Sequence, residues 1–152
     1  MSFNPTATLE AIQTHLVGIS EFGGRVSIDT PPRRVISEGL TAIISMASMQ
    51  VAETTLVSTI EVHTVTVRIY RAQASAASPD IEAERFTVIP QVFDALKGDF
   101  QLGGGIRNID WGGQYGTTPR VDFDEEEIAD KPYWTAHLTL PLIVDPDAVF
   151  VA

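Results

Sequence analysis

The sequence of 152 residues contains no cysteine. The chain therefore has no disulfide, no thiolate metal ligand and no thiol nucleophile, which excludes a disulfide-stabilised secreted scaffold and a thiol redox role. Cations are also few, because 10 lysines and arginines stand against 20 acidic residues and give a net charge of −10. An acidic surface repels nucleic-acid phosphates, so we expect no specific grip on DNA. The same repulsion suits a ring or channel through which DNA slides without sticking.

Long hydrophobic runs are missing as well. The apolar stretches are only a few residues long, well short of the roughly 20 needed to cross a bilayer. Residues 1–12 lack the basic start and apolar centre of a signal peptide. We therefore expect no membrane contact and a protein made and kept in a cytoplasm. With 44% hydrophobic and 20% charged residues, the composition is that of a globular chain, and we expect one domain over residues 1–152.

Two amphipathic helices are predicted. The first spans residues 5–20, because Asn4 is a good cap and Pro5 suits the first turn. Its apolar residues recur at spacings of three and four, at Leu9, Ile12, Leu16 and Ile19. The second starts at Ser78, contains Pro90 and ends near Gly98. Its predicted apolar row consists of Phe86, Ile89, Phe93, Leu96 and Phe100.

Extended structure is predicted for much of the remaining chain. Residues 25–28 form a candidate strand. Residues 41–70 contain no proline or glycine and are rich in β-branched side chains, which predicts two or three strands with at least one hairpin. Apolar residues occupy even positions at Ile60 and Val62 but odd positions from Val65 onward, so we expect a bulge near residues 63–64.

The last third of the chain adds short strands, loops and one long strand. Residues 106–111 are predicted as a short strand after a glycine turn at 103–105, followed by a loop over 112–119 and an acidic loop at 122–127. The final strand alternates, with Trp134, Ala136, Leu138, Leu140, Leu142 and Val144 on one face and Tyr133, Thr135, His137 and Thr139 on the other. The expected fold class is α+β, with a mostly antiparallel sheet packed by two helices and an extended β-hairpin arm.

No pattern of catalytic or metal-binding residues stands out. The histidines, at positions 15, 63 and 137, have no second histidine or carboxylate at a metal-ligand spacing. The acidic run resembles the start of a calcium loop, but Glu127 occupies the position where such loops need glycine. The glycines at 103–105 lack the Gly-Lys-Ser/Thr ending of a phosphate loop. We therefore expect no cofactor, no metal and no catalytic residue, and a structural or binding subunit rather than an enzyme.

Arg33 and Arg34 are the only adjacent cations in the chain. They follow two prolines, so one interpretation is a plain surface turn. The other is an arm that docks onto an acidic neighbouring subunit, because the planar guanidinium matches carboxylates across subunit contacts. The residues alone leave both interpretations open.

Three segments resemble the tail terminator proteins of long-tailed, siphovirus-like bacteriophages. They are residues 98–111 (Gly-Asp-Phe-Gln-Leu-Gly-Gly-Gly-Ile-Arg-Asn-Ile-Asp-Trp), residues 113–116 (Gly-Gln-Tyr-Gly) and residues 138–145 (Leu-Thr-Leu-Pro-Leu-Ile-Val-Asp). The family pattern is a helix ending in a Gly-Asp-Phe-like step, a glycine-led strand with an Arg-Asn-Ile-Asp-like core, and a final strand ending in valine-aspartate. The resemblance extends over residues 85–146.

The resemblance implies that residues 1–152 form a single tail-terminator-like α+β domain, assembled as a hexameric ring on the last ring of the tail tube. Such a ring ends tube polymerisation, joins the tail to head completion proteins and leaves a channel through which genome DNA passes without specific binding. The implied partners are copies of the chain, the tail tube protein and the head completion or connector protein. The implied location is the virion, at the head–tail junction, after assembly in the host cytoplasm.

The chain departs from the simplest family pattern at residues 41–70 and at the acidic insertion before Tyr133, and either is a candidate hairpin that reaches a neighbour. We predict subunit or partner contacts at Arg33, Arg34, Ile60, Val62, Arg68, Arg107, Trp111 and Tyr115. The acidic loop is expected to contribute negative potential near the DNA channel or a polar subunit contact, through Asp122, Asp124, Glu125, Glu126 and Glu127.

Two alternative functions are kept. A head completion (stopper) or tail tube subunit also uses a small acidic β-rich domain in a ring. A small-ligand binding module would use a pocket between the helices and the sheet near Trp111, Tyr115 and Trp134. The same three aromatic residues equally suit a core or a subunit contact.

Overall fold

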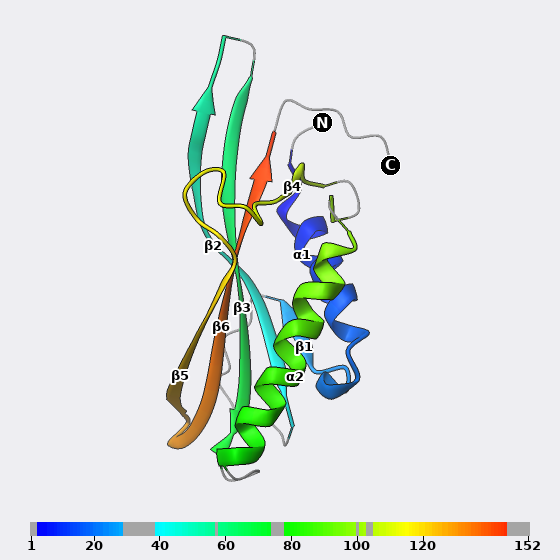
Figure 1. Cartoon of the computed structure of the whole chain (residues 1–152), viewed down its shortest axis with the longest axis vertical. Helices are drawn as coiled ribbons and strands as arrows, with labels where there is room; N and C mark the ends of the chain where they lie inside the picture. Colours follow the sequence, from blue (N-terminus) through cyan, green and yellow to red (C-terminus); the bar gives the residue numbers. More distant parts are fainter. Residues whose placement is uncertain are drawn as a thin grey trace.

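The chain folds into a curled sheet with two long helices on one face (Figure 1). The computed structural model describes residues 3–28, 39–56, 58–73, 78–99, 101–102 and 105–145. The predicted α+β class is confirmed. The elements in order are α1 (Pro5–Val17), the short helix η1 (Ser20–Phe22), β1 (Val26–Ile28), β2 (Thr41–Thr54), β3 (Thr59–Ala72), α2 (Ser78–Lys97), β4 (Asn108–Ile109), β5 (Arg120–Ile128) and β6 (Lys131–Val144).

Local signals define the start of α1. The side-chain oxygen of Asn4 accepts a hydrogen bond from the Ala7 backbone N–H at 3.1 Å, and Pro5 occupies the first turn. The helix ends at Val17, three residues before the predicted end at 20. At its far end, His15 Nε2 lies 2.9 Å from Asp99 Oδ2, which ties α1 to the residues that follow α2.

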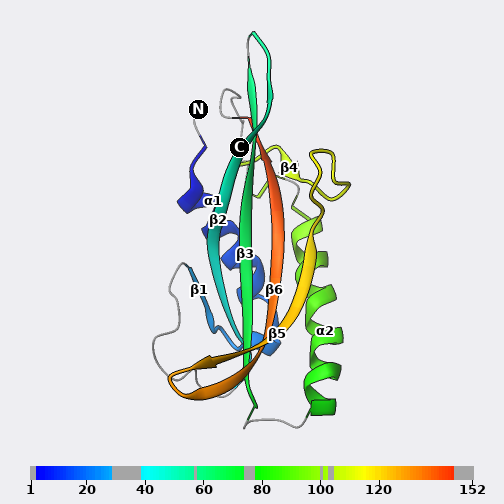
Figure 2. The same ribbon diagram turned by 90° about the vertical axis from the view of Figure 1, so that its left-hand side faces the viewer.

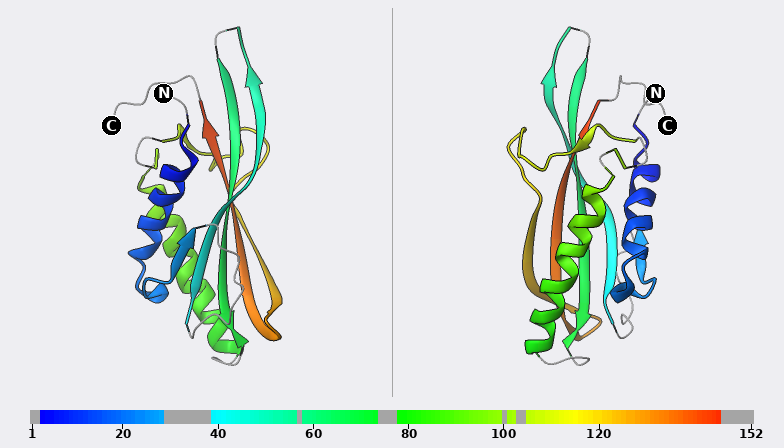
Figure 3. Two further views of the ribbon diagram at one scale, coloured as in Figure 1. Left: turned by 180° about the vertical axis from the view of Figure 1, so that it is seen from behind. Right: turned by 45° about the vertical axis from the view of Figure 1, so that its right-hand side comes forward.

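The sheet has the strand order β1-β2-β3-β6-β4, and β5 also pairs with β6. The pair β1–β2 is parallel and the other pairs are antiparallel. The hairpin of β2 and β3 projects beyond the helices in both views of Figure 3, so the predicted hairpin arm is confirmed. β4 contains only two residues, whereas the sequence predicted a strand over 106–111.

The predicted bulge lies in a different strand from the one expected. Register shifts occur in β2, between Met46 and Ser48 and between Val51 and Glu53. β3 pairs with β6 without interruption through residues 63–64. Ile60 and Val62 therefore lie on the sheet face opposite Val65 in an unbulged strand. They are apolar because that face is covered too, and they are only 7% and 4% exposed.

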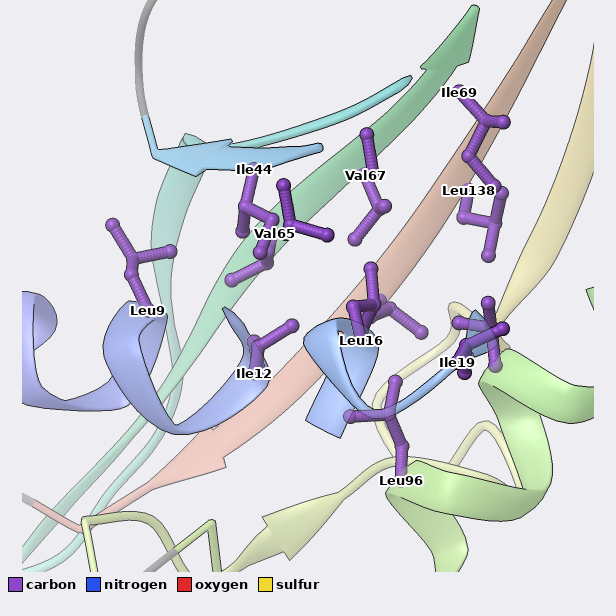
Figure 4. Packing of buried hydrophobic residues seen from close by; sticks show 14 of the residues in the cluster. Leu9, Ile12, Leu16, Ile19, Ile44, Val65, Val67, Ile69, Leu96 and Leu138 are labelled. Carbon is purple, nitrogen blue, oxygen red and sulfur yellow. The ribbon is translucent and has the colours of Figure 1, made fainter. Parts of the chain in front are cut away.

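The main core lies between the helices and one face of the sheet (Figure 4). Leu9, Ile12 and Leu16 of α1 pack toward Ile44 and Val65 of the sheet. The buried row of α2 consists of Val88, Val92 and Leu96.

The predicted apolar row of α2 is corrected in part. Phe86 is 76% exposed. Ile89 and Phe93 lie at the edge of the core, and Phe100 is outside the described residues. Spacings of three and four fit both rows, so periodicity alone does not choose between them. Pro90 lies inside the continuous helix.

The acidic run is a strand, not the loop that the sequence predicted. Residues 120–128 pair along β6 from Arg120 opposite Thr139 to Ile128 opposite Lys131. The connecting turn uses Ala129 and Asp130, with φ values of 51° and 64°. Two consecutive positive φ values suit the twist of a hairpin.

The β5–β6 hairpin curls across the sheet face that the helices leave free (Figure 2). A second apolar cluster forms beneath it, from Ile43, Tyr70 and Tyr133 with Ile128 at its margin. The rings of Tyr70 and Tyr133 meet edge-on with centroids 6.5 Å apart. Tyr133 and Thr135 lie on the face opposite the apolar row, as predicted, but the hairpin covers that face and leaves them 0% and 1% exposed.

Candidate assembly surfaces

The projecting part of the β2–β3 hairpin, here called the arm, comprises residues 47–56 and 58–61. Met49 and Val51 are 55% and 58% exposed, and Leu56 is fully exposed. These apolar side chains stand on a narrow hairpin that the helices do not cover (Figure 3). Exposed apolar side chains gathered on one element typify protein contact surfaces.

The outer backbone edge of the arm is also open. β1 pairs only with Ala42, Ile43 and Ile44 of β2. Among the described residues, no strand pairs with the same edge of β2 from Ser45 onward. An unpaired edge presents backbone N–H and C=O groups to another chain, so the arm is a place for strand pairing or packing between subunits.

Asp110 organises the loop between β4 and β5. Its side chain is buried, and its two carboxylate oxygens accept hydrogen bonds from the backbone N–H groups of Gln114 at 2.7 Å and Tyr115 at 3.0 Å. These bonds hold the loop on the sheet face opposite the helices. The Tyr115 hydroxyl donates to Glu53 Oε2 of the arm at 3.4 Å. Burial raises the pKa of Tyr115 above its ordinary value of 10.0, and Glu53 raises that pKa further.

The predicted contact residues Ile60 and Val62 are buried. Ile60 lies opposite Glu53 in the sheet register, so the two side chains share the face that Tyr115 reaches. Val62 lies opposite Ile143, which is 2% exposed. Ile60 and Val62 thus serve the subunit's own packing.

The remaining predicted contact residues occupy separate places. Arg33 and Arg34 lie outside the described residues. Arg107 is exposed beside β4, while Arg68 is half-buried on β3, in the sheet register opposite His137. Trp111 packs edge-on against Phe93 of α2, with ring centroids 6.0 Å apart.

Among the described residues, the three aromatic residues of the predicted ligand pocket lie in different places. Trp111 contacts the C-terminal part of α2, whereas Trp134 lies beneath Arg85 near the opposite end and Tyr115 faces the arm. A small cavity lined by Trp134, Val88 and Ile89 holds about 20 Å³. That volume accommodates a water molecule, not a metabolite.

A groove does open between α2 and β5, here called the α2–β5 groove. Its volume is about 340 Å³, and its lining is Arg85, Phe123, Asp124, Glu125 and Trp134. The Arg85 guanidinium carbon lies 4.6 Å from the centre of the Phe123 ring and 5.6 Å from that of Trp134. Phe123 is still 49% exposed. Burial lowers the pKa of Arg85 below its ordinary value of 12.5.

The five carboxylates of β5 fall on two faces of the strand. Alternation places Asp122, Asp124 and Glu126 on the face away from the helices and Glu125 and Glu127 on the other. Asp122 Oδ2 lies 3.2 Å from Arg120 Nε, and Glu126 Oε2 lies 3.4 Å from His137 Nε2. Burial raises the pKa of Tyr70 above its ordinary value of 10.0, and the charge of Glu126 raises it further.

Within the described residues, no three histidine, aspartate or glutamate side chains gather closely enough to hold a metal ion. None of the described helices is long and apolar enough to span a membrane.

Comparisons of the chain with known proteins were made at the level of sequence and of structure. No protein-family model matches the sequence, and no curated protein matches it. Among solved structures, the chain is similar to the sheath/tube terminator of an extracellular contractile injection system, PVC, in its extended state, with 15% identity and a TM-score of 0.42. The similarity covers 100% of this chain and 61% of that chain. The chain thus spans 61% of the length of that structure's chain.

Proposed function

We propose that the protein is a structural virion subunit of the tail-terminator type. It forms a ring at the head-proximal end of a phage tail, ends polymerisation of the tail tube and joins the tail to head completion proteins. The ring consists of copies of this chain, in the hexameric number that the sequence resemblance implies. It leaves a channel for DNA, and no residue of the chain acts as a catalyst.

The observation that carries the proposal is the folding of the resembling segments into one unit. Residues 98–111 and 138–145 are far apart in the sequence but pair through β4 and β6, with Asn108 opposite Ile143 and Ile109 opposite Leu142. The pairing continues on both sides of β4, because Arg107 N–H donates to Ile143 O at 2.9 Å and Asp110 N–H donates to Pro141 O at 2.8 Å. The resemblance therefore follows a contiguous structural unit instead of scattered matches.

The arm supplies a second line of support. A subunit that works alone gains nothing from Met49, Val51 and Leu56 on a projecting hairpin, because exposed apolar surface promotes association. A subunit that repeats around a ring buries such side chains against its neighbours or against the tube. Head-to-tail contacts between identical copies close into a ring when the rotation fits.

Electron microscopy tests the proposal directly. The purified chain should form rings of six-fold symmetry, and intact virions should carry it at the head-proximal end of the tail. The double variant M49S/V51S should form few rings while its circular dichroism spectrum stays unchanged. The matched control is V17S, because Val17 is 48% exposed on α1, away from the arm. A chain that stays monomeric and is absent from virions contradicts the proposal.

Deletion of the gene separates the terminator from the neighbouring structural roles. Loss of a terminator should give overlong or unfinished tails detached from heads. Loss of a tail tube protein should give no tails at all. Loss of a stopper should give finished tails and heads that do not join, which would assign the chain to that role instead.

A further inference from the structure

The β5–β6 hairpin has a root and a curled end that are held differently. At the root, the Arg85 guanidinium carbon of α2 lies 4.6 Å from the centre of the Phe123 ring on β5 and 5.6 Å from that of Trp134 on β6. The charge of Glu125 acts on the same guanidinium. Beyond this point, residues 126–133, here called the strap, curl across the sheet face opposite the helices (Figure 2). The strap therefore lies outside the part of the hairpin that Arg85 holds against α2.

A small apolar cluster holds the strap against the sheet. Tyr133 of the strap is 0% exposed, and its ring meets that of Tyr70 edge-on with centroids 6.5 Å apart. Ile43 completes the cluster, and Ile128 of the strap lies at its margin. These residues form a cluster separate from the main core. The closed position of the strap thus has apolar contacts of its own, which can be lost without disturbing the main core.

Burial of polar atoms around this cluster opposes closure. Among the described residues, the hydroxyl oxygens of Thr41 and Thr135 and the Nε atom of Arg68 are buried without a hydrogen-bond partner. Thr41 and Thr135 both lie opposite Tyr70 in the sheet register, one on β2 and the other on β6. Thr135 is 1% exposed. A buried polar atom without a partner carries a desolvation cost, and access of water removes that cost. Opening of the strap would therefore relieve a cost that closure imposes.

The charges of the strap add little to its closure. Glu126 turns toward the sheet, where its Oε2 atom lies 3.4 Å from Nε2 of His137. The side chains of this pair are 40% and 33% exposed, so solvent screens their attraction and the pair contributes little. The other charged residues of the strap are exposed, at Glu127, Asp130 and Lys131. Closure therefore rests on the balance between the aromatic cluster and the buried polar atoms.

We propose that the strap is a gate that opens by itself while the rest of the fold stays intact. The hinge lies just beyond the contact of Arg85 with Phe123 and Trp134. In the closed state the strap covers Tyr70 and the sheet face around it, and in the open state that face and its buried polar atoms meet water. Units with few buried apolar contacts of their own open well below the free energy of global unfolding. The inference concerns the single subunit and does not depend on the proposed ring.

Amide hydrogen exchange of the full chain tests the gate. The β5–β6 ladder runs from Arg120 opposite Thr139 to Ile128 opposite Lys131, so amides of the strap and of the root belong to one ladder. If the strap opens alone, amides of residues 126–133 should exchange on the order of a hundredfold faster than those of residues 136–144. Equal exchange rates in the two groups, with the same dependence on denaturant, overturn the gate.

Substitution of the buried hydroxyls separates this gate from ordinary fraying at the end of a hairpin. T135V replaces an unpartnered hydroxyl by a methyl group of similar shape, so it should stabilise the closed state and slow exchange of the strap by about tenfold. T41V should act in the same direction. The control T139V changes a half-exposed threonine of β6 outside the strap and should leave strap exchange unchanged. Slower strap exchange in either T135V or T41V supports the gate. Unchanged or faster strap exchange in both variants overturns it.

Discussion

Replacement of Asp110 by alanine should open the β4–β5 loop at a substantial cost in stability. The carboxylate of Asp110 is 2% exposed and accepts two backbone hydrogen bonds, at 2.7 Å and 3.0 Å. A hydrogen bond to a charged group contributes about 1.5–3 kcal/mol. The freed N–H groups of Gln114 and Tyr115 can bind water once the loop opens, so the lower end of this range, about 1.5 kcal/mol, applies to each hydrogen bond. The loss of both bonds in D110A should therefore lower the free energy of unfolding by about 3 kcal/mol.

The variant D110N refines this estimate. Its amide oxygen can still accept from Gln114, but its NH₂ group cannot accept from Tyr115. The loss should therefore be about half as large, about 1.5 kcal/mol.

Urea unfolding followed by circular dichroism measures both losses, and limited proteolysis between residues 112 and 119 reports the opening of the loop. The control D94A removes an exposed carboxylate of α2 and should change stability by less than about 0.5 kcal/mol. If D110A loses less than about 1 kcal/mol of unfolding free energy relative to the wild type, the two short hydrogen bonds do not hold the loop and the reasoning fails.

Three further substitutions probe the sheet and its connections. The pKa of Tyr70 is raised from 10.0 by burial and by Glu126, so the stability that its neutral hydroxyl contributes is complete below pH 10 and is lost as pH rises above it. Y70F should therefore lose less unfolding free energy than the wild type between pH 9 and pH 11, in paired urea titrations. Gly39 has a φ of 100°, and an added Cβ meets the guanidinium of Arg25, so G39A should lower stability by about 1–3 kcal/mol in a thermal melt. L138A removes a side chain with 0% exposure and should cost about 3 kcal/mol in the same melt, with the fold retained.

The elements that the sequence predicted well carry strong local signals. Asn4 and Pro5 mark the start of α1, and the side-chain contact of Asn4 with Ala7 is present as expected. The predicted apolar face of the final strand lies in the main core from Ala136 to Val144, although the residues between are buried too beyond Leu140. The helix cap and the strand alternation each involve residues that are close in the sequence, so both can be recognised without knowledge of the tertiary structure.

The elements predicted poorly depend on distant partners. Aspartate and glutamate are depleted in strands, so residues 122–127 predict a loop until β6 supplies a partner for each of them. The turn at Ala129 and Asp130 lacks the glycine that usually announces a hairpin. The bulge in β2 also had no local signal, since Ala47 and Ala52 resemble ordinary strand residues.

The candidate surfaces also divide into those that the local sequence indicates and those that depend on distant partners. The segment with Trp111 and Tyr115 was singled out by resemblance, and it does form an ordered loop. The contact of Tyr115 with Glu53 spans 62 positions of the chain, and no spacing in the sequence announces it. The α2–β5 groove combines residues from α2, β5 and β6, so it becomes visible only when the three elements are placed together.

The place of β5 changes what its acidity can do in a ring. Glu126 points inward to His137 and toward Tyr70, and Asp122 is paired with Arg120, so these two carboxylates act within the subunit. Asp124 and Glu125 border a groove at one margin of the sheet. In a ring whose subunit contact includes this margin, opposite charge on the two subunits would speed and orient their association, and salt would screen that attraction. Ring formation should therefore weaken at high ionic strength. If the carboxylates only line a DNA path, high salt should instead favour the ring, because it screens their mutual repulsion. The salt dependence of assembly thus distinguishes the two roles that the acidic run was expected to have.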